Sequence, residues 1–185
     1  MKKDTLQTTL DATSVTGKWI YRALSNDMIL ETSFDDLEFA AAIMDLTGTK
    51  QNTITGCLDM GEYGKLSITG HFLNEEKFRL TGKGEGITEG WVYDYVGYIV
   101  PEWTGENGSP KGVDQLDTLV GGVIRTVSHY ASTDPKHTGA VHPAGVTAST
   151  YFVRDTLAVQ PKLTLDATSV TGEWVYRALI NSTDV

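Results

Sequence analysis

Residues Thr9 to Asn26 read TLDATSVTGKWIYRALSN, and the second half of this stretch has the pattern of a β-strand. Side chains alternate between the two faces of a strand, so Trp19, Tyr21 and Ala23 share one face. The opposite face also carries bulky side chains, which indicates a strand buried on one side and partly covered on the other. The polar residues before Gly17 suit a turn.

The same stretch returns as TLDATSVTGEWVYRALIN from Thr164 to Asn181, with 15 of 18 positions identical. The offset of 155 residues is close to a domain length, but only residues 182–185 follow the second copy. We therefore expect a single domain over residues 1–160 and an additional C-terminal strand-like segment within residues 161–185. This segment is interpreted as an element for strand exchange, as an extra strand or as the start of a truncated tandem repeat. In this segment Trp174 and Tyr176 repeat Trp19 and Tyr21.

The length, charge and cysteine content of the chain limit its possible partners and location. The chain has 185 residues, 40% of them hydrophobic, so it is long enough for one substantial core. A net charge of −9 disfavours nucleic-acid and anionic membrane surfaces as partners. No apolar run is long enough to span a membrane, and no apolar signal core follows Met1. Cys57 is the only cysteine, and we expect it to be a small buried residue of a strand. Because the sequence has neither a signal peptide nor a pair of cysteines for a disulfide, it favours a cytoplasmic location.

Short β-patterned runs separated by turn residues cover most of the chain. Their spacing of roughly ten residues and their hairpin-sized connections predict an all-β fold, an antiparallel up-and-down eight-stranded β-barrel, with a sandwich as the alternative. The connections between these strands are too short to hold the crossover helices of a parallel α/β fold. The expected strands are Gly17–Leu24, Leu37–Thr47, Thr53–Met60, Lys65–Leu73, Lys77–Gly84, Gly90–Val100, Thr118–Ser128 and Gly145–Arg154, with the repeated segment near Gly172–Leu179 as a ninth.

Two stretches are less regular. The residues from Ser33 to Met44 combine a possible helix cap with good helix formers, and we favour a strand there over a helix. Pro101 to Gln115 is too long for a tight hairpin, and we expect it to form a loop that covers one mouth of the barrel.

The sequence Val15-Thr16-Gly17-Lys18-Trp19, at the start of the first strand of an eight-stranded meander, resembles the calycin superfamily, which includes the lipocalins and the avidins. The resemblance implies that the tryptophan closes one end of the barrel and, from the lipocalins, that an arginine of a late strand packs across it. Arg125 and Arg154 are the candidates. The chain does not match the ligand-contacting positions of avidin or the later lipocalin motifs, so neither biotin nor a lipid is implied.

The segment from Gly90 to Trp103 combines tryptophan, tyrosine and carboxylate side chains and is the most informative about chemistry. On a strand, Trp91, Tyr93 and Tyr95 share one face with Gly97. Such a face is either a stacking surface for a sugar or a flat apolar ligand, or an aromatic part of the core. We take Trp91, Tyr93, Tyr95 and Trp103, together with Arg125, as candidate ligand-binding residues.

Asp94, between two tyrosines, is the best candidate for an unusual carboxylate. If it faces inward it needs a partner such as Arg125, because an unpaired buried charge is costly. A paired structural aspartate is favoured over a general base. Arg125 is expected to lie against an aromatic ring or Asp94.

Metal and cofactor sites are not indicated. The spacing of His129, His137 and His142 fits neither a helical pair nor a zinc hairpin, and we expect the latter two to be solvated loop residues. We find no phosphate-binding loop, dinucleotide motif or nucleophile elbow, so no cofactor is expected.

Three functions remain. The first is a non-enzymatic barrel that binds a small apolar or aromatic ligand. The second is self-assembly, in which the C-terminal copy (Trp174, Tyr176) takes the place of the first strand (Trp19, Tyr21) of another chain, giving a homo-oligomer. The third is a cofactor-free cyclase or isomerase that uses Asp94 and neighbouring tyrosines for proton transfer. We favour the first two.

Overall fold

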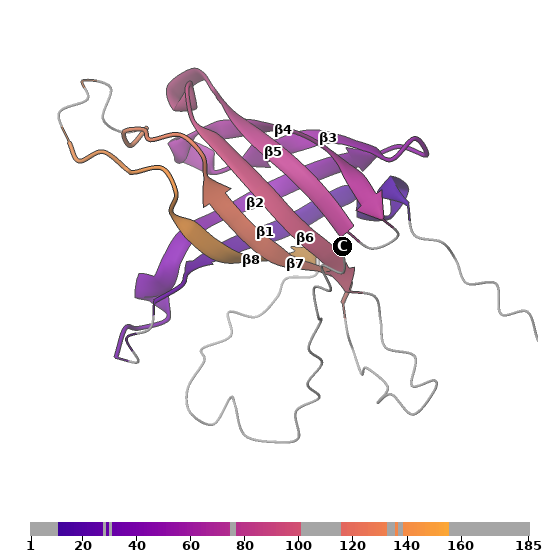
Figure 1. Cartoon of the computed structure of the whole chain (residues 1–185), viewed down its shortest axis with the longest axis horizontal. Coiled ribbons are helices and arrows are strands. Elements are labelled where there is room, and N and C mark those ends of the chain that lie inside the picture. Colours follow the sequence, from indigo (N-terminus) through magenta and orange to yellow (C-terminus); the bar gives the residue numbers. More distant parts are fainter. Residues whose placement is uncertain are drawn as a thin grey trace, which may run out of the picture. The chain divides into compact units, whose positions relative to one another are not determined.

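In the computed structural model, eight antiparallel strands follow one another in chain order and close into a barrel, because the last strand pairs with the first (Figure 1). The structure describes residues 11–27, 29, 31–74, 77–100, 116–132, 136 and 139–155. The predicted fold class is confirmed. The repeated C-terminal segment lies outside the described residues, as does the loop from Pro101 to Gln115.

The strands match the expected ranges to within three residues at each end. They are β1 (Gly17–Ser25), β2 (Glu38–Gly48), β3 (Thr53–Asp59), β4 (Lys65–Asn74), β5 (Lys77–Glu85), β6 (Val92–Val100), β7 (Thr118–Arg125) and β8 (Thr147–Arg154). Short 3₁₀ helices are η1 (Ala12–Val15), η2 (Asp35–Leu37), η3 (Gly61–Tyr63) and η4 (Gly86–Thr88).

The region that combined helix and strand signals is a strand, as favoured from the sequence. The helix signal is confined to the single turn of η2, after which β2 runs to Gly48. On both sides β2 has a partner, β1 and β3, and backbone pairing along its whole length outweighs the weak helix propensity of its alanines.

Alternate residues of each strand fill the barrel interior. The largest side chains that are almost completely buried include Trp19, Tyr21, Met44, Phe78 and Phe152. The ring of Phe152 packs edge to face on that of Phe78, with centroids 6.3 Å apart, and lies tilted against that of Tyr21, with centroids 4.9 Å apart. The first strand therefore buries the face that its period-two pattern predicts.

The end of the barrel where β1 begins, the Trp19 end, is closed by η1. Its Ala12 and Val15 are buried, and the indole Nε1 of Trp19 donates a hydrogen bond to the carbonyl oxygen of Val15 at 2.8 Å. A Cβ at Gly48 would lie 1.6 Å from the carbonyl oxygen of Ala12, so only glycine permits this close approach of η1 to β2.

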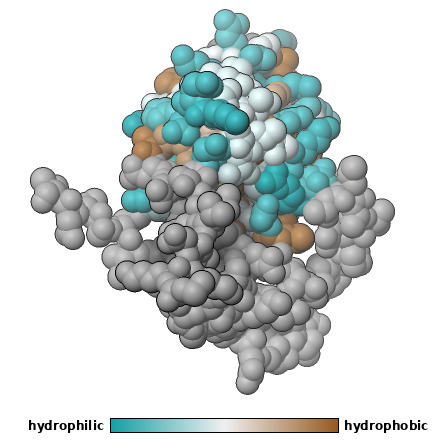
Figure 2. Space-filling view, turned by 90° about the vertical axis from the view of Figure 1, so that its right-hand side faces the viewer, coloured by the Kyte–Doolittle hydropathy of each residue, from teal (hydrophilic) through white to brown (hydrophobic). Residues whose placement is uncertain are grey.

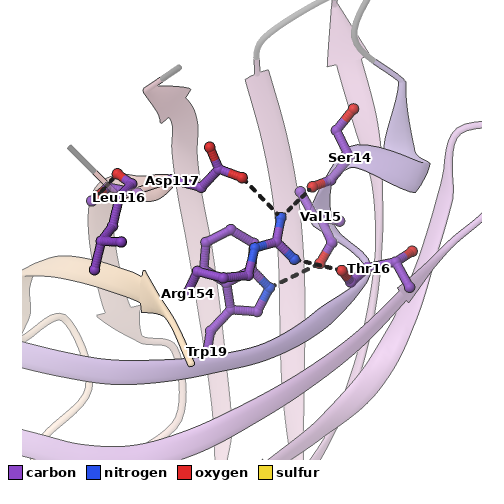
Figure 3. A network of polar contacts seen from close by, with 8 residues as sticks. Ser14, Val15, Thr16, Trp19, Leu116, Asp117 and Arg154 are labelled. Atoms are coloured by element: carbon purple, nitrogen blue, oxygen red, sulfur yellow. Dashed lines mark hydrogen bonds and ion pairs between the residues drawn. The ribbon is translucent and has the colours of Figure 1, made fainter. Parts of the chain in front are cut away.

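Arg154, the last residue of β8, packs across Trp19 (Figure 3). Its guanidinium carbon lies 4.0 Å from the ring centroid, and its nitrogens donate to the carbonyl oxygens of Thr16 at 2.6 Å and Ser14 at 3.0 Å. Asp117 accepts a longer contact of 3.4 Å. Of the two arginine candidates, Arg154 therefore occupies the position implied by the lipocalin resemblance.

The outer face of the barrel carries both polar and apolar side chains. Figure 2 shows hydrophilic residues interspersed with hydrophobic ones on the visible face, and exposed apolar side chains include Ile20, Ile43 and Val96. Cys57, expected to be buried, is instead half-buried, because it alternates with the buried Leu58 and so faces outward from β3. No helix in the described part of the chain is long and apolar enough to cross a membrane.

Replacing Arg154 by alanine is expected to destabilise the barrel by about 1–3 kcal/mol, because two carbonyl oxygens lose a charged donor and Trp19 loses its cover. The measurement is urea unfolding. Arg79→Ala is the matched control, since Arg79 is more than half exposed on the outer face and should change stability by about 0.5 kcal/mol or less. Equal effects of the two substitutions would contradict this role of Arg154.

Candidate functional site

The opposite end of the barrel, the Trp91 end, contains a cavity of about 360 Å³. β6 begins here and β7 ends here, and a β-bulge in β2 shapes the wall. Ala23 pairs with Ala40 but Leu24 pairs with Glu38, so Phe39 has no partner across from β1. Phe39 lines the cavity, as bulged residues often do when a strand must redirect one side chain.

Two tyrosines form the floor of the cavity. The rings of Tyr21 and Tyr95 pack edge to face with centroids 6.1 Å apart, and both residues are buried. Beyond them the interior is filled. A Cβ at Gly97 would lie 2.5 Å from the ring of Phe78, so the gap in the predicted aromatic face is occupied by this core ring and is not available to a ligand.

Above the floor, Arg125, Tyr93 and His129 form a chain of hydrogen bonds. The guanidinium Nε of Arg125 donates to the Tyr93 hydroxyl at 3.3 Å, and this hydroxyl lies 2.7 Å from Nε2 of His129. On the far side of the imidazole, Nδ1 lies 2.8 Å from the carbonyl oxygen of Tyr130. Arg125 also donates from Nη1 to the carbonyl oxygen of Pro143 at 3.0 Å.

The partners of His129 determine its tautomer. A carbonyl oxygen only accepts, so Nδ1 carries the proton that is donated to Tyr130. Burial lowers the pKa of His129, the Tyr130 carbonyl raises it, and the positive charge of Arg125 lowers it further. The ring is therefore neutral at pH 7, and its Nε2 accepts a hydrogen bond from the Tyr93 hydroxyl.

The tyrosines are also held neutral. Burial is the largest cause that raises the pKa of Tyr21, Tyr93 and Tyr95 above the ordinary value of 10.0. For Tyr93 the hydrogen bond from Arg125 lowers the pKa, because it stabilises the phenolate, but burial has the larger effect. None of these hydroxyls carries a negative charge at neutral pH to balance Arg125.

Aromatic rings extend the wall toward the mouth. Trp91 stacks on His129 with centroids 3.9 Å apart and an angle of 20° between the planes. His142 pairs with His129 through two backbone hydrogen bonds, and their rings lie 5.5 Å apart. Among the residues that the structure describes, no three His, Cys, Asp or Glu residues are grouped to hold a metal ion.

The structure thus brings Trp91, Tyr93, Tyr95 and Arg125 to one cavity. Arg125 lies against rings, as expected, with its guanidinium carbon 5.2 Å from the Phe39 centroid and 5.8 Å from that of Tyr93. Trp103, the remaining candidate ligand-binding residue, lies outside the described residues.

Asp94 does not line the cavity. It faces outward from β6, where Thr81 donates to it at 2.6 Å and Arg79 pairs with it at 3.3 Å. The inward alternative considered from the sequence, with Arg125 as its partner, is not the observed one. Trp19 and Tyr21, expected to take part in assembly, are interior residues of β1.

Sequence reasoning missed two residues of this site. His129 was assigned to the end of a strand, but its buried side chain connects Trp91, Tyr93 and Tyr130. His142 was expected to be a solvated loop residue; it is exposed, yet it lines the cavity. The bulge that turns Phe39 inward has no distinctive signal in the sequence of β2, whose alanines fit either face.

In comparisons with protein-family models, with curated proteins and with solved structures, no match to this chain was found.

We expect the stability of the protein to decrease as the pH falls below about 6.5. The unfolded chain binds a proton at His129 near that pH, whereas the folded state resists protonation to a lower pH because the His129 pKa is lowered. Below the ordinary histidine pKa the unfolded state therefore holds more protons, and the stability contributed by neutral His129 is lost until the folded-state pKa is passed.

The measurement is urea unfolding at pH 7 and pH 5 for the wild type and His129→Gln. Because glutamine does not titrate, the stability advantage of the wild type over the variant should be larger at pH 7 than at pH 5. An advantage that is unchanged with pH would show that His129 is protonated equally easily in both states.

Proposed function

We propose that this protein is a non-enzymatic, calycin-like barrel that binds a small ligand in the cavity at its Trp91 end. The observation that carries the proposal is the asymmetry of the interior. One end is packed solid by η1, Trp19 and Arg154, whereas the other holds a cavity of about 360 Å³. This volume lies within the range of about 300–1,000 Å³ that is typical of small-molecule sites.

The lining supports a ligand that is mostly apolar or aromatic. Phe39, Trp91 and Tyr93 supply ring surfaces, and Leu58, Met60 and Leu66 supply aliphatic ones. The polar groups of the wall include the hydrogen-bonded chain of Arg125, Tyr93 and His129. A pocket of mainly apolar wall with a small number of converging polar groups is the usual composition of a binding site.

The calycin likeness has independent support at the other end of the barrel. The Gly17-Lys18-Trp19 motif begins β1, and an arginine of the last strand covers the tryptophan. The motif carries the resemblance and the arginine cover was implied by it, and both features concern the closure of the barrel and not the choice of ligand.

Ligand binding is tested by two-dimensional NMR with neutral flat probes, namely cinnamyl alcohol and cinnamamide. Binding should shift the indole N–H signal of Trp91, which lines the cavity, and leave that of Trp19, which is buried at the closed end, unchanged. Ala40→Leu, which adds bulk to the cavity wall, should abolish the shift. The matched control is Val96→Leu on the outer face. Equal shifts of both tryptophans, or none at any probe concentration, would contradict the proposal.

A second function, self-assembly through the C-terminal copy, is favoured by the positions at which the two copies differ. Lys18 and Ile20, replaced by Glu173 and Val175, face outward from β1. The third difference replaces Ser25, at the last position of the strand, by Ile180.

All buried residues among the described positions of the first copy, 11–26, recur in the second. They are Ala12, Val15, Trp19, Tyr21 and Ala23, which return as Ala167, Val170, Trp174, Tyr176 and Ala178. The interior contacts made by η1 and β1 are therefore available to the second copy. We infer that the copy takes the place of β1 in another chain, which gives head-to-tail contacts.

Removing the residues after Gln160 should convert a self-associating protein into a folded monomer, as measured by light scattering over a wide range of concentration. Trp174→Ala in the full chain should have the same effect, because the interior position of Trp19 cannot be filled by alanine. The matched control is Val175→Ile, which restores the outward residue of the first copy and should leave association unchanged. A full chain that stays monomeric at every concentration would contradict assembly.

A further inference from the structure

Arg125 carries a positive charge that no described carboxylate neutralises. The residue is only 8% exposed, and none of the ion pairs among the described residues includes it. Glu38, the acidic residue of the cavity wall, is paired with Arg22 at 2.8 Å. A buried cation without a counter-charge is costly to maintain.

The groups that hold Arg125 leave part of its hydrogen-bonding fork unused. Nε donates to Tyr93 and Nη1 donates to the carbonyl oxygen of Pro143, whereas Nη2 has no hydrogen-bond partner among the described residues. The rings of Phe39 and Tyr93 lie against the guanidinium. These contacts orient the side chain, but all of its partners are neutral.

The other titratable groups on the cavity wall do not offset this charge. Tyr21, Tyr93 and Tyr95 remain protonated, and His129 remains neutral, because burial disfavours their charged forms. His142 and Glu38 are nearer to solvent, and Glu38 already has a cationic partner. The cavity is therefore locally positive in a protein whose net charge is −9.

The floor restricts the length of a ligand. Tyr21 and Tyr95 close the cavity, and Phe78 and Phe152 fill the interior beyond them. A long acyl chain would have to displace these rings, whereas a compact ring system fits above them. The walls that surround this space are largely aromatic.

We propose that the ligand is a compact aromatic monocarboxylate, whose carboxylate pairs with Arg125 and whose ring lies among the aromatic side chains of the wall. The proposal rests on the proposed ligand-binding function and names its substrate class. A carboxylate matches the planar fork of an arginine and supplies the missing counter-charge.

The test compares cinnamate with cinnamamide, which has nearly the same shape and no charge, by calorimetry at pH 7.5. We expect the wild type to bind cinnamate about tenfold more tightly or more, the range of a charged hydrogen bond gained over a neutral one. In Arg125→Gln the two probes should bind with affinities within about twofold of each other. Arg125→Lys should keep part of the preference, because it retains the charge and loses the fork.

The outcomes separate the two proposals. Equal affinities of cinnamate and cinnamamide for the wild type would overturn the carboxylate assignment and leave ligand binding intact. Failure of both probes to bind would overturn ligand binding itself, and the assignment with it. If Arg125→Gln does not fold, the comparison of the two probes on the wild type and Arg125→Lys decides the question.

Discussion

The pairing of β8 with β1 is the constraint on which the rest of the structure depends. Residues Trp19 to Ser25 pair with Arg154 to Ala148, and this closure gives every strand one face inside the barrel. An eight-stranded barrel has an interior that side chains can just fill, so the size of the inward residues decides whether any space remains. Large rings at the Trp19 end leave none. Alanines and a bulge in β2 leave a cavity at the Trp91 end.

A chain of hydrogen bonds among neutral groups ends at the charged guanidinium of Arg125 in the cavity. The Tyr130 carbonyl orients His129, His129 accepts from Tyr93, and Tyr93 accepts from Arg125. Each group therefore fixes the direction of the next hydrogen bond. Because burial opposes the ionisation of the histidine and the tyrosine, the arginine keeps the only buried charge among these groups. These hydrogen bonds orient the groups before any ligand enters, which lowers the entropic cost of binding.

The sequence predicted the features that follow from local periodicity. Alternation along β1 and β6 placed Trp19, Tyr21, Tyr93 and Tyr95 inside, and turn residues placed the strand ends to within three residues. Arg125 was expected to lie against an aromatic ring or Asp94, and the rings of Phe39 and Tyr93 are the partners that it has.

What the sequence did not predict depends on contacts between distant segments. His129 joins the site because the segment after β7 pairs with the segment before β8 through His142, and no local pattern announces such a bridge. Asp94 and Cys57 lie on outward faces, and the polar partners that Asp94 meets there come from β5. Phe39 turns inward only because of the register shift between β1 and β2.

The repeated segment is best understood from the same closure. The barrel has one position for a first strand, and the residues of η1 and β1 that are buried there recur at the matching positions of the C-terminal copy. The proposed exchange between chains would preserve the interior contacts of the barrel, including the hydrogen bond from the tryptophan to η1 and the cover that Arg154 provides. In the proposed exchange, the balance between monomer and oligomer would be set by protein concentration, by the connecting segments and by the few substitutions between the copies. The two copies are identical at the positions that are buried in the first copy and differ at positions that are not buried there. This is the pattern expected of a segment that fits this barrel.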